Sequence, residues 1–211
     1  MRFHCVVIGA ALALAQPAMA AEQLDLREFH IGERVQDLPK EGYGSFTCAD
    51  ASGQTISGWD DYKMCPADAS GFHAVGFRYT EESNPVGQVN ESYQGTKVAG
   101  HPVLLALLIG DDGVVDGIRI QTDPKARLYL RKKAFLLGEQ AKEHYGEDGW
   151  VCHDVQPTGD EEPVGGVFVK QHCEKRTPTR HVIVDRELYR RAGQPLQDFV
   201  AGSQVLILRA G

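Results

Sequence analysis

The first 20 residues have the three parts of a secretory signal, and they constrain the fold most because they decide the redox compartment in which the chain folds. Arg2 supplies a positive charge, residues 6–15 form a short apolar run, and Ala18-Met19-Ala20 is a small-residue cleavage site. The run is too short to span a bilayer, which takes about 20 residues. A buried N-terminal helix is the alternative. We expect residues 1–20 to be a cleaved signal peptide and the protein to be periplasmic or secreted.

Four cysteines follow the signal, an even number that favours disulfides in an oxidising compartment. Cys48, Cys65, Cys152 and Cys173 allow three pairings, of which proximity in the sequence favours Cys48–Cys65 and Cys152–Cys173. Each disulfide would close a loop of roughly 20 residues and stabilise the fold by about 3 kcal/mol. Zinc held by two cysteines and two histidines is the alternative, but the C-x₂-C spacing of common zinc sites is missing. No CxxC redox motif occurs either.

The chain beyond the signal is long enough for one good core or for two small, closely packed halves. We divide it at the start of a predicted helix, into a β-rich half over 21–123 and a helix-plus-strand half over 124–211. The formal net charge is −7, which argues against nucleic acid as a partner. The longest later apolar run, 103–109, is too short for a membrane span.

A single helix is predicted over 124–145. Pro124 suits its first turn and Gly146 its end. Apolar residues recur at helical spacing and would face the core: Leu130, Ala134, Leu137, Ala141 and Tyr145.

Strands are predicted on both sides of this helix. Alternation in 75–79, the apolar run 103–109 and the segment 114–122 after a Gly-Asp-Asp-Gly turn indicate strands before it. Segments 150–155, 166–173 and 181–185 indicate a meander after it, and 203–209 indicates a final strand. We therefore predict an α+β fold, a mostly antiparallel sheet with one long helix packed on it. Two similar αβ halves, the first with a helix over 31–38, are an alternative.

The segment 29–35, Phe-His-Ile-Gly-Glu-Arg-Val, resembles the apolar-Gly-x-x-x-Val helix entry of small exported repeat proteins. These include the β-lactamase inhibitor protein and the SmpA/OmlA type of outer-membrane assembly lipoprotein. The resemblance implies two αβ repeats, with one disulfide in each repeat as in the inhibitor.

The pair Cys152-His153 and the pair His172-Cys173 are mirror images in the sequence. If Cys152 lies opposite Cys173 on paired antiparallel strands, His153 lies opposite His172, and both histidines face away from the disulfide. Two imidazoles about 5 Å apart are a candidate metal site if a carboxylate completes it. The alternative is two ordinary surface histidines.

A second candidate site is the run Trp59-Asp60-Asp61-Tyr62, inside the first predicted disulfide loop. Aromatic side chains on a constrained loop are typical of recognition surfaces, because they bury a large area at a low cost in entropy. The alternative is that Trp59 packs into the core beneath the loop.

The usual catalytic and nucleotide-binding motifs are absent: no GxSxG, HExxH, P-loop or GxGxxG occurs, and the sequence indicates no cofactor. We expect an exported accessory protein, an inhibitor or assembly factor, that recognises another exported protein. A small hydrolase with scattered histidines and carboxylates, or a protein that binds a metal or small ligand, is the alternative.

Overall fold

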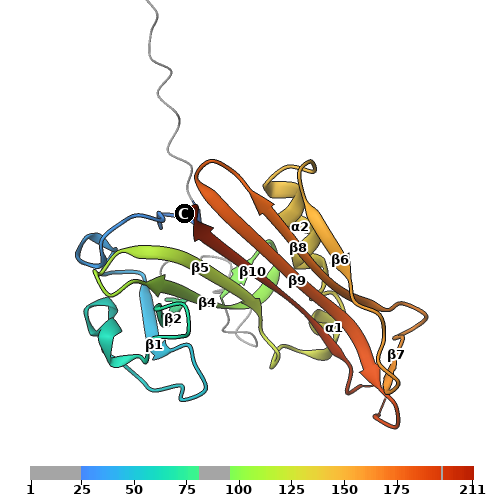
Figure 1. The fold of residues 1–211 in the computed structure, drawn as a ribbon. Coiled ribbons are helices and arrows are strands. Elements are labelled where there is room, and N and C mark those ends of the chain that lie inside the picture. The colour runs from blue at the N-terminus through green and yellow to red at the C-terminus, as the bar shows by residue number, and fades with distance from the viewer. Residues whose placement is uncertain (1–24, 81–95, 196) are drawn as a thin grey trace, which may run out of the picture.

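The structure is a computed structural model, and it describes residues 25–80, 96–195 and 197–211. Eight strands follow one another across an antiparallel sheet in the order β1-β2-β4-β5-β10-β9-β8-β6, while β3 pairs with β4 and β7 with β9 (Figure 1). The strands are β1 (Tyr43–Cys48), β2 (His73–Tyr79), β3 (Lys97–Val98), β4 (His101–Ile109), β5 (Val115–Thr122), β6 (Val151–Asp154), β7 (Glu161–Glu162), β8 (Val169–Arg176), β9 (Arg180–Arg191) and β10 (Val200–Arg209).

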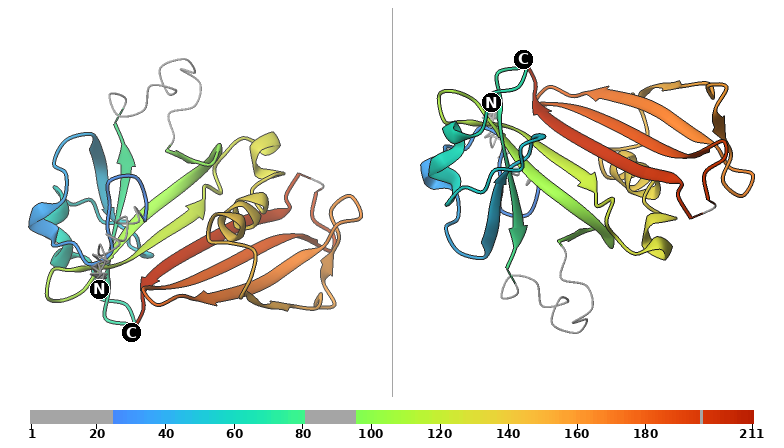
Figure 2. Two further views of the ribbon diagram at one scale, coloured as in Figure 1. Left: turned by 90° about the horizontal axis from the view of Figure 1, so that it is seen from above. Right: turned by 90° about the horizontal axis from the view of Figure 1, so that it is seen from below.

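The two halves of the chain share this sheet. The predicted β4–β5 hairpin is present, with its turn at Gly110–Gly113, where Gly113 has φ 77°. The last strand, β10, then lies between β5 and β9 and joins the two halves. Figure 2 shows this continuity from above and below, with β5 and β10 side by side in both views. Both α-helices of the described residues lie in the second half of the chain, so the described part of the first half does not repeat its helix-plus-strand arrangement.

The sheet is antiparallel as predicted, but the predicted α+β fold class, with one long helix packed on the sheet, is wrong. The sheet dominates the fold, and the described residues contain only short helices. The segment predicted as a helix over 124–145 is divided into α1 (Leu128–Arg131) and α2 (Leu136–His144). The buried hydroxyl of Ser203 on β10 lies 3.1 Å from the carbonyl oxygens of Ala134 and Phe135 at the break. Carbonyls that accept from a side chain compete with the helical ladder, which explains the interruption.

The helix predicted over 31–38 is likewise wrong. The segment contains only η1 (Val35–Asp37), a single turn of 3₁₀-helix. A second 3₁₀ segment, η2 (Trp59–Met64), lies in the first disulfide loop. Both segments are too short to be stable helices on their own, so contacts with the rest of the fold position them.

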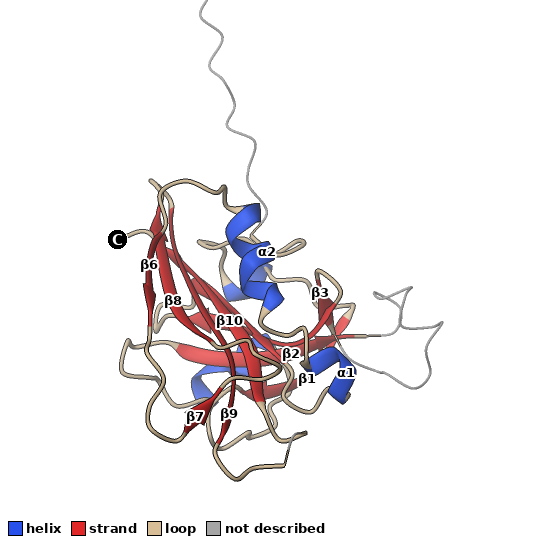
Figure 3. Cartoon of the chain, turned by 90° about the vertical axis from the view of Figure 1, so that its right-hand side faces the viewer, coloured by secondary structure: helices blue, strands red, loops and turns tan. Residues whose placement is uncertain are grey.

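The core lies along one face of the sheet and includes Val75, Leu107, Ile118, Val184 and Val205. The short helix α2 packs against β9 and β10 on this face (Figure 3). The approach is close, because a Cβ on Gly138 would lie 2.9 Å from Val184 Cγ1. No helix among the described residues is long and apolar enough to cross a membrane.

Both predicted disulfides are present. Cys48–Cys65 joins the end of β1 to the end of the η2 loop, and Cys152–Cys173 joins β6 to β8. Three of the four cysteines are almost fully buried, and Cys152 alone is exposed. The first disulfide therefore belongs to the core, and the second lies at the border between core and surface.

Candidate functional site

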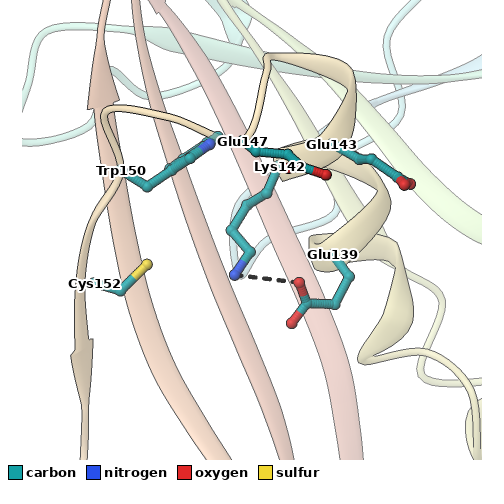
Figure 4. A pocket seen from close by; sticks show the side chains of 6 residues that line it. All are labelled: Glu139, Lys142, Glu143, Glu147, Trp150 and Cys152. Atoms are coloured by element: carbon teal, nitrogen blue, oxygen red, sulfur yellow. Dashed lines mark ion pairs between the residues drawn. The ribbon is translucent and has the colours of Figure 1, made fainter.

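A groove lies between α2 and the edge strand β6. Because α2 covers β9 and β10, the strands β8 and β6 extend beyond it at the edge of the sheet. The hollow has a volume of about 480 Å³ and is lined by Glu139, Lys142, Glu143, Glu147, Trp150 and Cys152. Figure 4 shows Trp150 and Cys152 on one side of it, with Lys142 and Glu139 projecting from the helix on the other.

Strand β6 forms the open border of this groove. It pairs with β8 on one side, and the structure places no strand on its other side within the ranges it describes. The amide of Val155 donates to the carbonyl of Lys170 at 2.7 Å. Because every second residue of an antiparallel strand bonds to the same neighbour, the backbone groups of His153 and Val151 also point toward β8. The backbone N–H and C=O groups of Cys152 and Asp154 then point outward. An outward row of this kind is a template for another strand.

The disulfide and Trp150 hold this border in place. A pairing of only four residues is short for a stable edge strand, and the Cys152–Cys173 bond fixes its register in the middle. Trp150 Nε1 donates to the Gly146 carbonyl at 2.8 Å, and the Lys175 ammonium lies 5.8 Å from the centre of the Trp150 ring. The indole is thus a half-buried, oriented wall of the groove.

The groove carries a negative charge. Glu139 forms ion pairs with Lys142, at 3.2 Å, and with Arg186. Glu143 and Glu147 are exposed and form no ion pair among the residues that the structure describes. Three carboxylates and one ammonium line the hollow, so it favours a cationic group in a bound molecule.

The paired histidines have the predicted register, with Cys152 opposite Cys173 and His153 opposite His172. Both ring nitrogens of His172 are engaged: Nδ1 lies 2.6 Å from Asp185 Oδ1, and Nε2 lies 3.1 Å from Glu174 Oε1. The hydrogen bond with Asp185, followed by that with Glu174, raises the pKa of His172.

A second histidine completes this cluster. His181 Nε2 lies 2.8 Å from Glu174 Oε2, and the bonds from His172 and His181 lower the pKa of Glu174. The groups therefore satisfy one another as hydrogen-bonded pairs. Within the described part of the chain, no group of three or more His, Cys, Asp or Glu side chains has an arrangement that fits a metal ion.

The run from Trp59 to Tyr62 is placed in the core rather than on a recognition surface. Trp59 is 5% exposed and packs edge-on against Phe29, Phe46 and Phe77, while its Nε1 donates to the Pro39 carbonyl at 2.9 Å. The Tyr62 hydroxyl lies 3.2 Å from the Asp111 carbonyl oxygen. Of the four residues, Asp60 is exposed and Asp61 is half-buried, and the Asp61 carboxylate accepts from the Ser57 amide within the same loop. Only the acidic side chains of the run remain available to a partner.

Sequence reasoning missed the groove. Trp150 and Cys152 lie in the segment 150–155 that is predicted as a strand, but the sequence predicts no role for Glu139 or Lys142. The sequence offers one signal, a short predicted strand with a valine on either side of Cys152; the structure leaves both of these residues, Val151 and Val155, exposed. Comparisons with protein-family models, curated proteins and solved structures find no match to this chain.

Proposed function

We propose that this protein is an exported binding protein that recognises an extended, basic segment of another protein and adds it as a strand beside β6. The observation that carries the proposal is the outward row of backbone groups on β6, bordered by the groove to α2. Addition of a strand to an exposed sheet edge is a common mode of peptide recognition, in which backbone bonds give affinity and pockets give specificity.

The specificity would come from the groove. Alternate side chains of an added strand point to the same face, so every second residue of the partner would enter the space between β6 and α2. Trp150 offers an aromatic wall there, and Glu143 and Glu147 offer free carboxylates. A lysine or arginine in the partner could make a cation–π contact with the Trp150 ring and an ion pair with one of these carboxylates.

The hydrolase alternative has weaker support. The cluster of His172, His181, Glu174 and Asp185 lies on strand surfaces, and its members already pair with one another. A general base needs a free nitrogen within reach of a substrate proton. No observation favours a metal-dependent function over strand addition.

The test is site-specific photo-crosslinking in the native exported protein. A photo-reactive amino acid at position 155, beside the open edge, is expected to give one covalent adduct with another exported protein. The same amino acid at position 131 on α1, away from the groove, serves as the control position. Absence of an adduct from position 155, or equal adducts from both positions, would contradict the proposal.

A matched pair of variants tests the strand mechanism. Asp154→Pro removes an outward N–H without removing a bond to β8, and proline is tolerated at the open side of edge strands. Asp154→Ala removes the same carboxylate, which accepts from Gln171 at 2.6 Å, but keeps the N–H. We expect the adduct to be lost in Asp154→Pro and kept in Asp154→Ala. Adducts of equal yield in both variants would exclude strand addition.

A further inference from the structure

We propose that a second hollow, on the sheet face opposite the core, binds a small phosphate monoester. This hollow lies over β1, β2, β4 and β5 and has a volume of about 540 Å³. It lies on strands at the far side of the sheet from β6, so the inference is independent of strand addition.

Small residues at paired positions create the space. Gly76 on β2 lies opposite Ala106 on β4, and Ala106 lies opposite Arg119 on β5. A glycine and an alanine side by side leave a depression where neighbouring rows carry full side chains. Strand β1 packs closely against Gly76, because a Cβ added to this glycine would lie 3.1 Å from Thr47 Oγ1.

The rim is shaped by a bulge in β1. The pairing of β1 with β2 shifts between Gly44 and Thr47, and Ser45 has φ 54° there. A non-glycine residue in the left-handed region is uncommon, and β-bulges recur where a strand re-aims its side chains beside a binding site. Ser45 and Thr47 both line the hollow and offer hydroxyl groups.

The charges in the hollow favour a dianion. Arg78, Arg119 and Lys125 line it together with one carboxylate, that of Asp50, which gives a net charge of +2. Asp50 accepts hydrogen bonds from the Ser52 amide, the Ser52 hydroxyl and the Gly53 amide, so its carboxylate is held by its own loop.

Arg119 is the central cation of this set. It is half-buried, and one of its guanidinium nitrogens donates to the Ala49 carbonyl. Burial lowers the pKa of Arg119, and the negative charge of Asp68 acts in the opposite direction. Among the residues that the structure describes, Arg78, Arg119 and Lys125 form no ion pair. Four of the five N–H groups of a guanidinium thus remain for a ligand.

A phosphate monoester fits these features best. It carries a charge of about −1.5 to −2 at pH 7 and three acceptor oxygens, and arginine binds it in a bidentate manner. The half-exposed Leu104 also lines the hollow and offers an apolar contact to the organic part of the ester. The volume exceeds what one inorganic ion fills and lies in the range of small-ligand sites.

Calorimetry on the full mature protein tests this inference, with glucose 1-phosphate, inorganic phosphate, glucose and citrate as the probes. We expect saturable binding of glucose 1-phosphate, weaker binding of inorganic phosphate and citrate, and none of glucose. Arg119→Gln and Arg78→Gln are each expected to weaken binding by about 10-fold or more, since each removes a charge-assisted contact. Ala106→Leu, which fills the hollow, is expected to abolish binding. Arg176→Gln on β8, where the side chain is 70% exposed, is the matched control and is expected to have no effect.

Several outcomes would overturn the proposal. They are the absence of saturable heat with glucose 1-phosphate up to about 10 mM, tighter binding of citrate than of the ester, and unchanged binding in both arginine variants. If Ala106→Leu fails to fold, the two arginine variants still test the proposal, because the Arg78 and Arg119 side chains line the hollow and their replacement by glutamine does not fill it. None of these variants touches β6, so loss of the crosslinked adduct and loss of phosphate binding are separate results.

Discussion

His73 Nε2 lies 2.9 Å from Asp111 Oδ1, and this contact ties the start of β2 to the turn between β4 and β5. On the other side of the ring, Nδ1 lies 2.6 Å from the carbonyl oxygen of Cys65. Both partners are acceptors, so the imidazolium, with two N–H donors, satisfies them better than the neutral ring. The bond with Cys65, followed by that with Asp111, raises the pKa of His73.

The first prediction concerns the pH dependence of stability at His73. A pKa raised above the unfolded value of about 6.5 stabilises the fold below that pH, and the stabilisation is lost as the pH rises through the folded value. We expect His73→Ala to lower the free energy of unfolding more at pH 5.5 than at pH 8.5. Urea denaturation at the two pH values measures the difference. In an Asp111→Asn background the pH dependence is expected to shrink, and an equal loss at both pH values would contradict this account.

Local chemistry explains which features the sequence predicted. The hairpin turn at Gly110–Gly113 depends on adjacent residues, and the alternation in β2 and β5 is a property of each strand alone. The register of Cys152 with Cys173 follows from one disulfide between neighbouring strands, and it sets His153 opposite His172 without further information.

Distant contacts explain what the sequence did not predict. The break in the helix depends on Ser203, about seventy residues away in the chain, whose hydroxyl competes for the carbonyls of Ala134 and Phe135. The burial of Trp59 depends on Phe29 and Phe77 from other elements. The groove depends on where α2 crosses the sheet, which no periodicity within α2 defines.

The second prediction compares two adjacent leucines in α2. Leu137 is 2% exposed and faces the sheet, whereas Leu136 is 37% exposed. Leu137→Ala is expected to cost about 2–5 kcal/mol in the free energy of unfolding, because it leaves a cavity, and Leu136→Ala below about 1 kcal/mol. Chemical denaturation of both variants measures these costs. Similar values for the two would show that α2 does not pack on β9 and β10 through this face.

The third prediction concerns the role of the second disulfide. Replacing Cys152 and Cys173 with alanine is expected to cost about 3 kcal/mol, as for a loop of this length. The amides of β6 should then exchange faster with solvent, because the four-residue pairing loses its fixed point. Hydrogen exchange read by mass spectrometry measures this, with β9 and β10 as internal references. Removal of Cys48–Cys65 is the control and should leave β6 exchange unchanged; unaltered β6 exchange after loss of Cys152–Cys173 would refute the prediction.

The last prediction concerns the ion pair that fixes the start of the described chain to the sheet. Arg180 on β9 donates to both carboxylate oxygens of Asp25, at 2.5 and 2.7 Å, and Asp25 also accepts from the Ile31 amide at 2.8 Å. The Asp25 side chain is 3% exposed and that of Arg180 is 18% exposed.

The two partners should respond differently to substitution. Arg180→Gln leaves a nearly buried carboxylate without its charge partner, and we expect a cost of about 3–5 kcal/mol. Asp25→Asn leaves a guanidinium that can still reach water, so its cost should be smaller. The double variant should cost less than the sum of the single variants, because the pair acts as one unit. Urea denaturation of the three variants and of the unsubstituted protein provides the double-mutant cycle. Equal costs for the single variants, or strict additivity in the double variant, would show that Asp25 and Arg180 are not coupled in the folded protein.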